Sequence, residues 1–326
     1  MNVQKIADLD LSKHPLYSLV RAEGSYSLYT GGMDSHLLRV DLNNLGSILR
    51  QNPLLDQDPE FQKISGLQTS IYTLLEDPLK EKIWLGGGSG ILQNLDQKTQ
   101  TFHYSLNLGK SPIYSLAYIS ENLWIGLGNG QIVLLKKEII QELNMGLDPK
   151  LVKIPENSFA ISKEALRVIA LKPDQSQLAI SGKDSQIRIL NPDSLDVQFT
   201  LEGHSFPVFS LAYSIDGKYL LSGSRDASIK IWNAENYKLI HTIPAHLFAI
   251  NHILYHPNRP YFLTASMDKS IKVWGSDDFK LYKILNAEKT GGHISSVNRL
   301  AWVGHSDPIL VSISDDRRMI FWDFEF

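Results

Sequence analysis

The sequence has no cysteine among its 326 residues, which excludes disulfide bonds, thiol catalysis and thiolate metal ligands. It also lacks a run of about 18 consecutive apolar residues, so no transmembrane helix is expected, and its first residues lack the apolar core of a signal peptide. The formal net charge of -3 gives no basic field that would attract nucleic acid nonspecifically. We therefore expect a soluble, intracellular, cytoplasmic protein without membrane association.

Two common ligand-binding patterns are missing as well. The glycine runs at 86–90 and 126–130 are not followed by the Lys-Ser/Thr pair and the helix of a phosphate-binding loop. His252 and His256 lie four apart on a predicted strand, with no carboxylate at ligand spacing, so ordinary strand residues are favoured over a zinc site. The sequence predicts no metal and no cofactor.

What the sequence does contain is a repeat. A histidine, a serine or threonine, an aspartate and a tryptophan occur in this order three times toward the C-terminus. The three sets are His204, Ser222, Asp226, Trp232; His246, Thr264, Asp268, Trp274; and His293, Ser312, Asp316, Trp322. The second set follows the first after 42 residues, and the third is slightly stretched, at 47 to 48 residues. A period of about 40 to 45 residues is typical of β-propeller blades with four strands each.

Weaker copies extend the repeat to seven units. Asp34 and Asp184 keep the turn aspartate in the first and fourth units, whereas glycine-rich turns follow Trp84 and Trp124 in the second and third. Glycine supplies the positive φ that a tight hairpin needs. The sequence predicts an all-β fold in a single domain over 1–326, a seven-bladed β-propeller of four-stranded antiparallel blades. The predicted blades are approximately 14–51, 66–105, 109–154, 162–200, 204–243, 246–286 and 293–326.

The two ends of the sequence predict how the ring closes. Only three strands of the last blade precede Phe326, so the fourth strand must come from elsewhere. The alternating segment 3–9 precedes the first blade, and we expect it to be the outer strand of the seventh blade. Such a pairing removes a free sheet edge.

Two insertions interrupt the repeat. Residues 136–145 predict a short helix with Ile139, Ile140 and Leu143 on one side. Extra residues near 52–62 separate the first two blades, and either 46–51 or 61–64 fits the fourth strand there. Long loops on a rigid scaffold often carry function, so both insertions are candidates for specificity.

The strongest three units resemble those of WD40 repeat proteins. The resemblance lies in the spacing from Gly203-His204 to Trp232, from Ala245-His246 to Trp274, and from Gly292-His293 to Trp322-Asp323. It is weaker in the second and third units, but as a statement about the fold it covers nearly the whole chain. In that family the four recurring residues form one buried hydrogen-bonded chain in each blade. This implied structural role is favoured over a catalytic triad, because three copies of one nucleophile in a ring would make an unusual enzyme.

The resemblance also implies a binding surface. In WD40 proteins the face that carries the b–c turns and the d–a loops usually binds partners, and one position near the start of strand a points toward the mouth of the channel. That position is occupied in turn by Tyr17, Tyr72, Tyr114, Arg167, Phe209, Asn251 and Asn298. The residues before the turn aspartates add Met33, Lys183, Arg225, Met267 and Asp315.

This composition is typical of a recognition surface, since aromatic, methionine and arginine side chains give large contact area and directional donors. The alternative is that the aromatic residues of strand a only pack between blades. Arg167, Lys183 and Arg225 come from adjacent blades and suggest a basic sector that favours an acidic or carboxylate group on a peptide.

The sequence therefore predicts a non-catalytic scaffold that binds a protein or peptide through its narrow face and channel mouth. The alternative is a small-molecule-binding or enzymatic propeller that uses the same mouth. An active site there would need converging carboxylates or histidines, and the predicted ring has only the peripheral Asp315. Binding of nucleic acid is a third possibility, since aromatic residues can stack on bases, but the net charge disfavours it.

Overall fold

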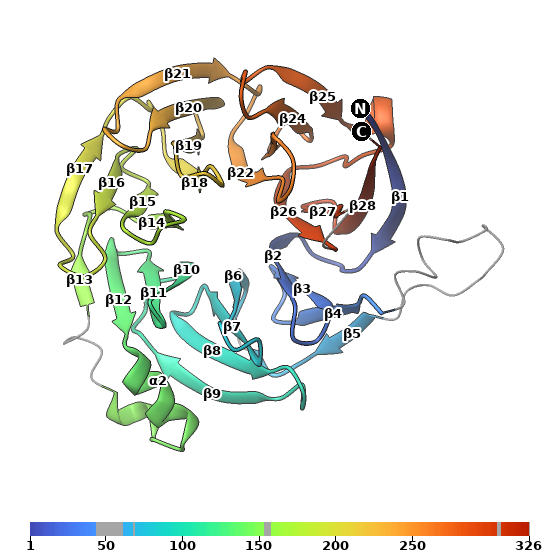
Figure 1. The fold of residues 1–326 in the computed structure, drawn as a ribbon. Helices are drawn as coiled ribbons and strands as arrows, with labels where there is room; N and C mark the ends of the chain where they lie inside the picture. Colours follow the sequence, from blue (N-terminus) through green and yellow to red (C-terminus); the bar gives the residue numbers. More distant parts are fainter. Residues whose placement is uncertain (44–60, 68, 153–157, 305–307, 326) are drawn as a thin grey trace.

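The computed structural model describes residues 1–43, 61–67, 69–152, 158–304 and 308–325. Within these ranges, seven four-stranded antiparallel sheets lie around a central channel as the blades of a propeller (Figure 1). Both the seven blades and their antiparallel pairing confirm the predicted fold. Among the described residues, no helix combines the length and the hydrophobicity needed to cross a bilayer.

Six blades take their four strands from consecutive parts of the chain, running from the channel outward. Blade 1 comprises β2 (Leu16–Ala22), β3 (Ser27–Gly32), β4 (Leu37–Asp41) and β5 (Phe61–Ile64), and blade 2 comprises β6 (Ile71–Glu76), β7 (Lys82–Gly87), β8 (Ile91–Asp96) and β9 (Phe102–Asn107). Blade 3 comprises β10 (Ile113–Ile119), β11 (Asn122–Leu127), β12 (Gln131–Leu135) and β13 (Ser158–Ala160), and blade 4 comprises β14 (Leu166–Leu171), β15 (Leu178–Gly182), β16 (Ile187–Leu190) and β17 (Val197–Leu201). Blade 5 comprises β18 (Val208–Tyr213), β19 (Tyr219–Ser224), β20 (Ser228–Asn233) and β21 (Leu239–Pro244), and blade 6 comprises β22 (Ile250–Tyr255), β23 (Tyr261–Ser266), β24 (Ile271–Gly275) and β25 (Leu281–Leu285).

Burial is greatest in the second strand of a blade and least in the fourth, at the outer edge. The second strand is covered on both faces by neighbouring blades, so β15 is buried along its whole length. The fourth strand lies at the rim, and β17 is exposed at every position except Leu201. Apolar residues therefore form continuous runs in the second strands, as expected for strands that are buried on both faces.

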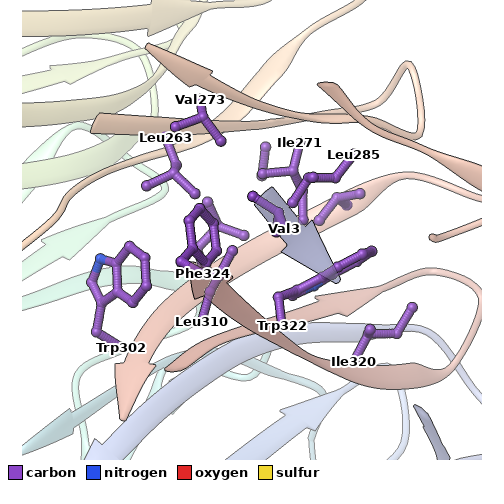
Figure 2. Packing of buried hydrophobic residues seen from close by; sticks show 13 residues of the cluster. Val3, Leu263, Ile271, Val273, Leu285, Trp302, Leu310, Ile320, Trp322 and Phe324 are labelled. Atoms are coloured by element: carbon purple, nitrogen blue, oxygen red, sulfur yellow. The ribbon is translucent and has the colours of Figure 1, made fainter. Parts of the chain in front are cut away.

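Blade 7 joins the two ends of the chain, as predicted. Its strands are β26 (Val297–Val303), β27 (Ile309–Ser314), β28 (Arg318–Glu325) and, at the outer edge, β1 (Asn2–Asp10). The pairing of β1 with β28 runs from Asn2 opposite Glu325 to Asp10 opposite Arg318, and the termini lie side by side (Figure 1). Figure 2 shows the Val3 side chain within the apolar cluster that also contains Ile271, Trp322 and Phe324. The N-terminal segment thus supplies both backbone pairing and core packing to the last blade.

The predicted ends of two blades were wrong. The fourth strand of blade 1 is β5, which pairs with β4 and lies beyond the predicted end at 51. The competing segment 46–51 and most of the predicted insertion 52–62 lie outside the described residues. The fourth strand of blade 3 is β13, beyond the predicted end at 154. Both errors have one cause: an insertion between the third and fourth strands breaks the constant period on which the assignment depended.

The insertion in blade 3 contains the predicted helix. It forms as α2 (Lys137–Asn144) and is followed by a 3-10 helix, η1 (Pro149–Leu151). Leu143 is buried, and Ile139 and Ile140 pack against the apolar cluster between blades 2 and 3. The contacts of Ile139 and Ile140 hold α2 against the outside of the ring, away from the channel. A second short helix, α3 (Ala287–Thr290), precedes blade 7.

Candidate partner-binding surface

One backbone irregularity recurs at the start of every innermost strand. In β2, Leu16 pairs with Gly32 and Ser18 with Gly31, so Tyr17 is left without a partner residue. Register shifts of the same kind occur in the other six blades. Such β-bulges redirect a side chain that would otherwise follow the regular alternation. The seven bulged residues are Tyr17, Tyr72, Tyr114, Arg167, Phe209, Asn251 and Asn298.

These seven side chains meet at the mouth of the channel. Together with Arg299 they line one cavity of about 450 Å³. The bulges explain how residues so far apart in sequence gather at one place, because each innermost strand contributes the same redirected position. We call the seven bulged residues, without Arg299, the mouth ring.

One half of the mouth ring is a stack of flat side chains. The ring centroids of Tyr17 and Tyr72 are 6.0 Å apart, and those of Tyr72 and Tyr114 are 5.4 Å apart with planes inclined by 16°. The Arg167 guanidinium carbon lies 3.8 Å from the centroid of the Tyr114 ring, a cation–π contact. Burial is the main cause that raises the pKa of Tyr17, and the electrostatic effects of Asp315 and Tyr72 raise it further. The Tyr17 hydroxyl therefore stays protonated. The stack gives a rigid wall of aromatic surface that ends in a positive charge.

The other half is a hydrogen-bonded polar network. Asn251 Nδ2 donates to Ser296 Oγ at 3.0 Å and to the Val297 carbonyl at 2.9 Å. Asn298 Nδ2 donates to the Leu16 carbonyl at 2.6 Å and to Asp315 Oδ1 at 2.7 Å. Burial raises the pKa of Asp315, although the hydrogen bond from Asn298 opposes the shift. The two asparagines therefore hold blades 6, 7 and 1 together at the mouth.

The predicted rim residues differ in how accessible their functional groups are. Arg225, Met267 and Met33 are exposed. Lys183 is also exposed, but its Nζ lies 2.9 Å from Glu164 Oε2. The predicted basic sector therefore has two cations without a carboxylate partner in the described residues, Arg167 and Arg225, and a third whose charge is largely compensated.

The structure adds apolar residues at the rim that the sequence analysis missed. Phe206, Leu247, Phe248 and Ile294 follow the recurring histidines, and their exposed fractions range from 52% to 82%. A signal for them was present, because apolar side chains in a d–a loop directly after the histidine depart from the polar composition of exposed loops. With Met33 and Met267 they form what we call the apolar rim, over blades 5, 6, 7 and 1.

The recurring polar residues hold the apolar rim in place. The backbone N–H of Leu247 donates to Asp268 Oδ2 at 3.1 Å, and that of Ile294 donates to Asp316 Oδ2 at 3.0 Å. Ser205, next to Phe206, donates to Asp226 Oδ2 in the same way at 3.1 Å. Each d–a loop is therefore anchored to the adjoining b–c turn at the narrow face.

Each of the three sets of recurring residues forms one buried hydrogen-bonded chain. In blade 5, His204 Nδ1 donates to Asp226 Oδ2 at 2.8 Å, Ser222 Oγ donates to His204 Nε2 at 2.8 Å, and Trp232 Nε1 donates to Ser222 Oγ at 2.9 Å. The same contacts join His246, Thr264, Asp268 and Trp274 in blade 6, and His293, Ser312, Asp316 and Trp322 in blade 7. The hydroxyl in each chain accepts from an indole, so it is part of the core and not a free nucleophile.

Burial alone would raise the pKa of Asp226, Asp268 and Asp316. The hydrogen bonds that each carboxylate accepts, above all from the paired histidine, outweigh burial and hold each pKa well below the ordinary value. These carboxylates are therefore ionised over the whole physiological range.

The two histidines that raised the question of zinc lie apart in the fold. His252 lines the channel, and its Nδ1 accepts a hydrogen bond from the Leu300 N–H at 3.2 Å. His256 packs on Trp302 with ring centroids 4.5 Å apart. Within the described part of the chain, no group of three or more His, Cys, Asp or Glu side chains is arranged to hold a metal ion.

Comparison with known proteins agrees with this geometry. The family model described as "WD domain, G-beta repeat" matches residues 195–233 and 237–275, which include most of blades 5 and 6. No curated protein sequence matches the chain. The two matched repeats, the hydrogen-bonded chains of blades 5 to 7 and the ring of seven four-stranded blades identify the chain as a WD40 repeat protein.

Proposed function

We propose that the protein is a non-catalytic scaffold that binds a protein or peptide partner through its narrow face, using the mouth ring and the apolar rim. WD40 propellers generally serve as interaction scaffolds, and this proposal assigns the contact to particular residues. An acidic or carboxylate group of the partner would bind at Arg167 and Arg225.

The observation that carries the proposal is the bulge in all seven innermost strands. A β-bulge re-aims one side chain, and in every blade the re-aimed side chain lines the shared cavity. Besides two asparagines, the residues gathered there are three tyrosines, a phenylalanine and an arginine, and these five are of types enriched where proteins recognise partners.

The apolar rim supports the same surface. Leu247 and Phe248 are exposed beside each other in one loop, with Met267 on the b–c turn of the same blade. Exposed apolar side chains that gather in neighbouring loops of one face are typical of a binding surface. Arg225 lies in the adjacent blade, so an apolar segment that carries an acidic residue would match both features.

The test is a crosslinked affinity purification from native-source lysate with four proteins. They are the wild type, a mouth variant (Tyr72→Ala, Tyr114→Ala, Phe209→Ala), a rim variant (Leu247→Asp, Phe248→Asp) and a control (Leu79→Asp, Ile215→Asp). The control replaces exposed apolar residues in the a–b connections, at the opposite face. Each variant is first shown to be folded by its circular dichroism and melting temperature.

We expect partners that are retained by the control and lost from both the mouth and the rim variants. Partners lost only from the control would place recognition on the opposite face and contradict the proposal. If no partner is specific to the wild type, the small-molecule alternative at the channel mouth becomes the better one.

A further inference from the structure

A second cavity lies in the channel next to the mouth ring. Its volume is about 210 Å³, room for about seven water molecules at about 30 Å³ each. Each innermost strand contributes the residue that follows its bulge: Ser18, Thr73, Ser115, Val168, Ser210, His252 and Arg299. Tyr114, Arg167 and Arg299 line both this cavity and the mouth cavity, so the two adjoin. We call the inner one the channel chamber.

The channel chamber contains positive charge without a compensating carboxylate. No Asp or Glu is among the residues that line it. The Arg299 guanidinium makes no hydrogen bond or ion pair with any of the described residues, and burial lowers its pKa. Arg167 contacts the Tyr114 ring, and its buried Nε has no hydrogen-bond partner among the described residues. A cation withdrawn from bulk water without a partner is costly, and an anion in the chamber would offset that cost.

Hydrogen-bond donors surround the same space. Ser115 is only 7% exposed, and its Oγ has no hydrogen-bond partner in the part of the chain that the structure describes. Ser210 Oγ accepts from the Ile253 N–H at 2.8 Å, which leaves its own hydrogen free to donate. Because His252 Nδ1 is an acceptor, the neutral ring carries its hydrogen on Nε2. An unpaired guanidinium together with several neutral donors is the set of groups that binds an oxyanion.

We propose that the channel chamber is a binding site for a small oxyanion of the phosphate type, which enters from the narrow face and is held by Arg299. Two sources share this chemistry, free inorganic phosphate and a phosphoryl group on a partner that inserts through the mouth ring. The site itself does not depend on the proposed partner binding.

The test is isothermal titration of the full chain with inorganic phosphate at low ionic strength, with chloride as the control anion. We expect saturable binding with a dissociation constant in the millimolar range or tighter. Arg299→Gln should weaken binding about tenfold or more, because it removes a charge-assisted contact. Arg317→Gln removes an exposed arginine that lines neither cavity and should leave the affinity unchanged.

A second variant keeps the test informative if Arg299→Gln does not fold. Ser115→Ala removes only the unpartnered hydroxyl, and we expect it to weaken phosphate about two- to fivefold. Phosphate should also shift the ring resonances of His252 in the wild type and not in Arg299→Gln. The absence of saturable phosphate binding, or equal affinity in the folded Arg299→Gln variant, would overturn the proposal.

Titration with an acetylated phosphoserine methylamide, a small model of a phosphorylated partner, distinguishes the two sources of phosphate. Tighter binding of this compound than of phosphate, with the excess lost in Tyr72→Ala, identifies a phosphorylated partner. Equal or weaker binding identifies the free anion, and either result requires the site to exist. If the mouth variant loses its partners but still binds phosphate, both proposals stand independently. Phosphate binding without any partner at the narrow face would retain this site and reject the proposed scaffold.

Discussion

At the scale of single residues, the turn aspartates of blades 5 to 7 each satisfy several donors at once. Asp268 accepts from His246 Nδ1 at 2.8 Å, from the Leu247 N–H at 3.1 Å, and from the Ser270 N–H and Oγ at 3.1 and 2.6 Å. Asp268→Ala would leave a buried imidazole N–H unpaired. We expect the free energy of unfolding, measured with urea, to fall by about 3 kcal/mol.

Asp193→Ala is the matched control, because that aspartate is exposed and its side chain forms no hydrogen bond or ion pair with any of the described residues. It should change stability by no more than about 0.5 kcal/mol. An equally small effect in Asp268→Ala would show that the hydrogen-bonded chains add little to the stability of the ring.

Buried histidines should make the protein sensitive to acid. Burial and the charge of Arg259 lower the pKa of His256 to about 4 from an ordinary 6.5. The unfolded chain therefore takes up a proton as the pH falls below about 6.5, while folded His256 stays neutral until about pH 4. Stability must decrease as the pH falls through this window, by up to about 1.4 kcal/mol per pH unit for this residue.

Urea unfolding at several pH values measures this slope. His256→Gln should reduce it, since Gln cannot titrate. His103→Gln replaces an exposed histidine and should leave the slope as it is in the wild type. A slope unaffected by either change would mean that His256 is not held neutral in the fold.

At the scale of structural elements, β1 closes the ring through its outer pairing with β28. Val3 and Leu9 are buried, and Arg318 Nη1 lies 2.7 Å from Asp8 Oδ2. Burial of two such side chains contributes about 3 to 6 kcal/mol. Deletion of residues 1–10 should therefore lower the melting temperature by about 10 °C or more, as measured by differential scanning calorimetry.

Two point variants in β1 separate the effect of packing from that of strand pairing. Val3→Asp places a charge in the apolar cluster of Figure 2, whereas Gln4→Asp places the same charge on the exposed side of the strand. Val3→Asp should reproduce most of the decrease in melting temperature and Gln4→Asp little of it. A truncated protein as stable as the full chain would show that the ring closes without β1.

The elements that were predicted correctly are those for which the repeat kept its register. The mouth ring could be read from the sequence because each innermost strand starts at a fixed distance from its turn, although the bulges themselves left no recognisable pattern. The fourth strands β5 and β13 were misplaced because insertions of arbitrary length precede them. The pairing of Lys183 with Glu164 was also missed, because it depends on how side chains meet across a turn.

At the scale of the whole molecule, the seven blades are not equivalent. Blades 5 to 7 contain complete hydrogen-bonded chains, and in blade 4 Ser162 Oγ takes the place of the histidine and donates to Asp184 at 2.8 Å. Among the described residues, the buried Trp124 Nε1 of blade 3 has no hydrogen-bond partner, and neither amide atom of the fully buried Asn94 of blade 2 is paired. The recurring hydrogen-bonded chain is therefore complete in blades 5 to 7 and partial in blade 4, and the described residues of blades 2 and 3 do not form it.

This difference between the blades predicts where the ring opens first. Repeat architectures can unfold locally, and a blade with unpaired buried polar groups costs less to open than one without them. Native-state hydrogen exchange should show the amides of β8 and β12 exchanging about tenfold or more faster than those of β20 and β24, a difference of about 1.4 kcal/mol in opening free energy. All four are third strands, each hydrogen-bonded on both sides, so strand position does not account for the difference.

Asn94→Leu removes two unpaired polar atoms and should slow exchange in blade 2 while leaving blades 5 and 6 unchanged. Uniform exchange rates in all blades would instead mean that the closed ring unfolds as one cooperative unit, because β1 joins its ends.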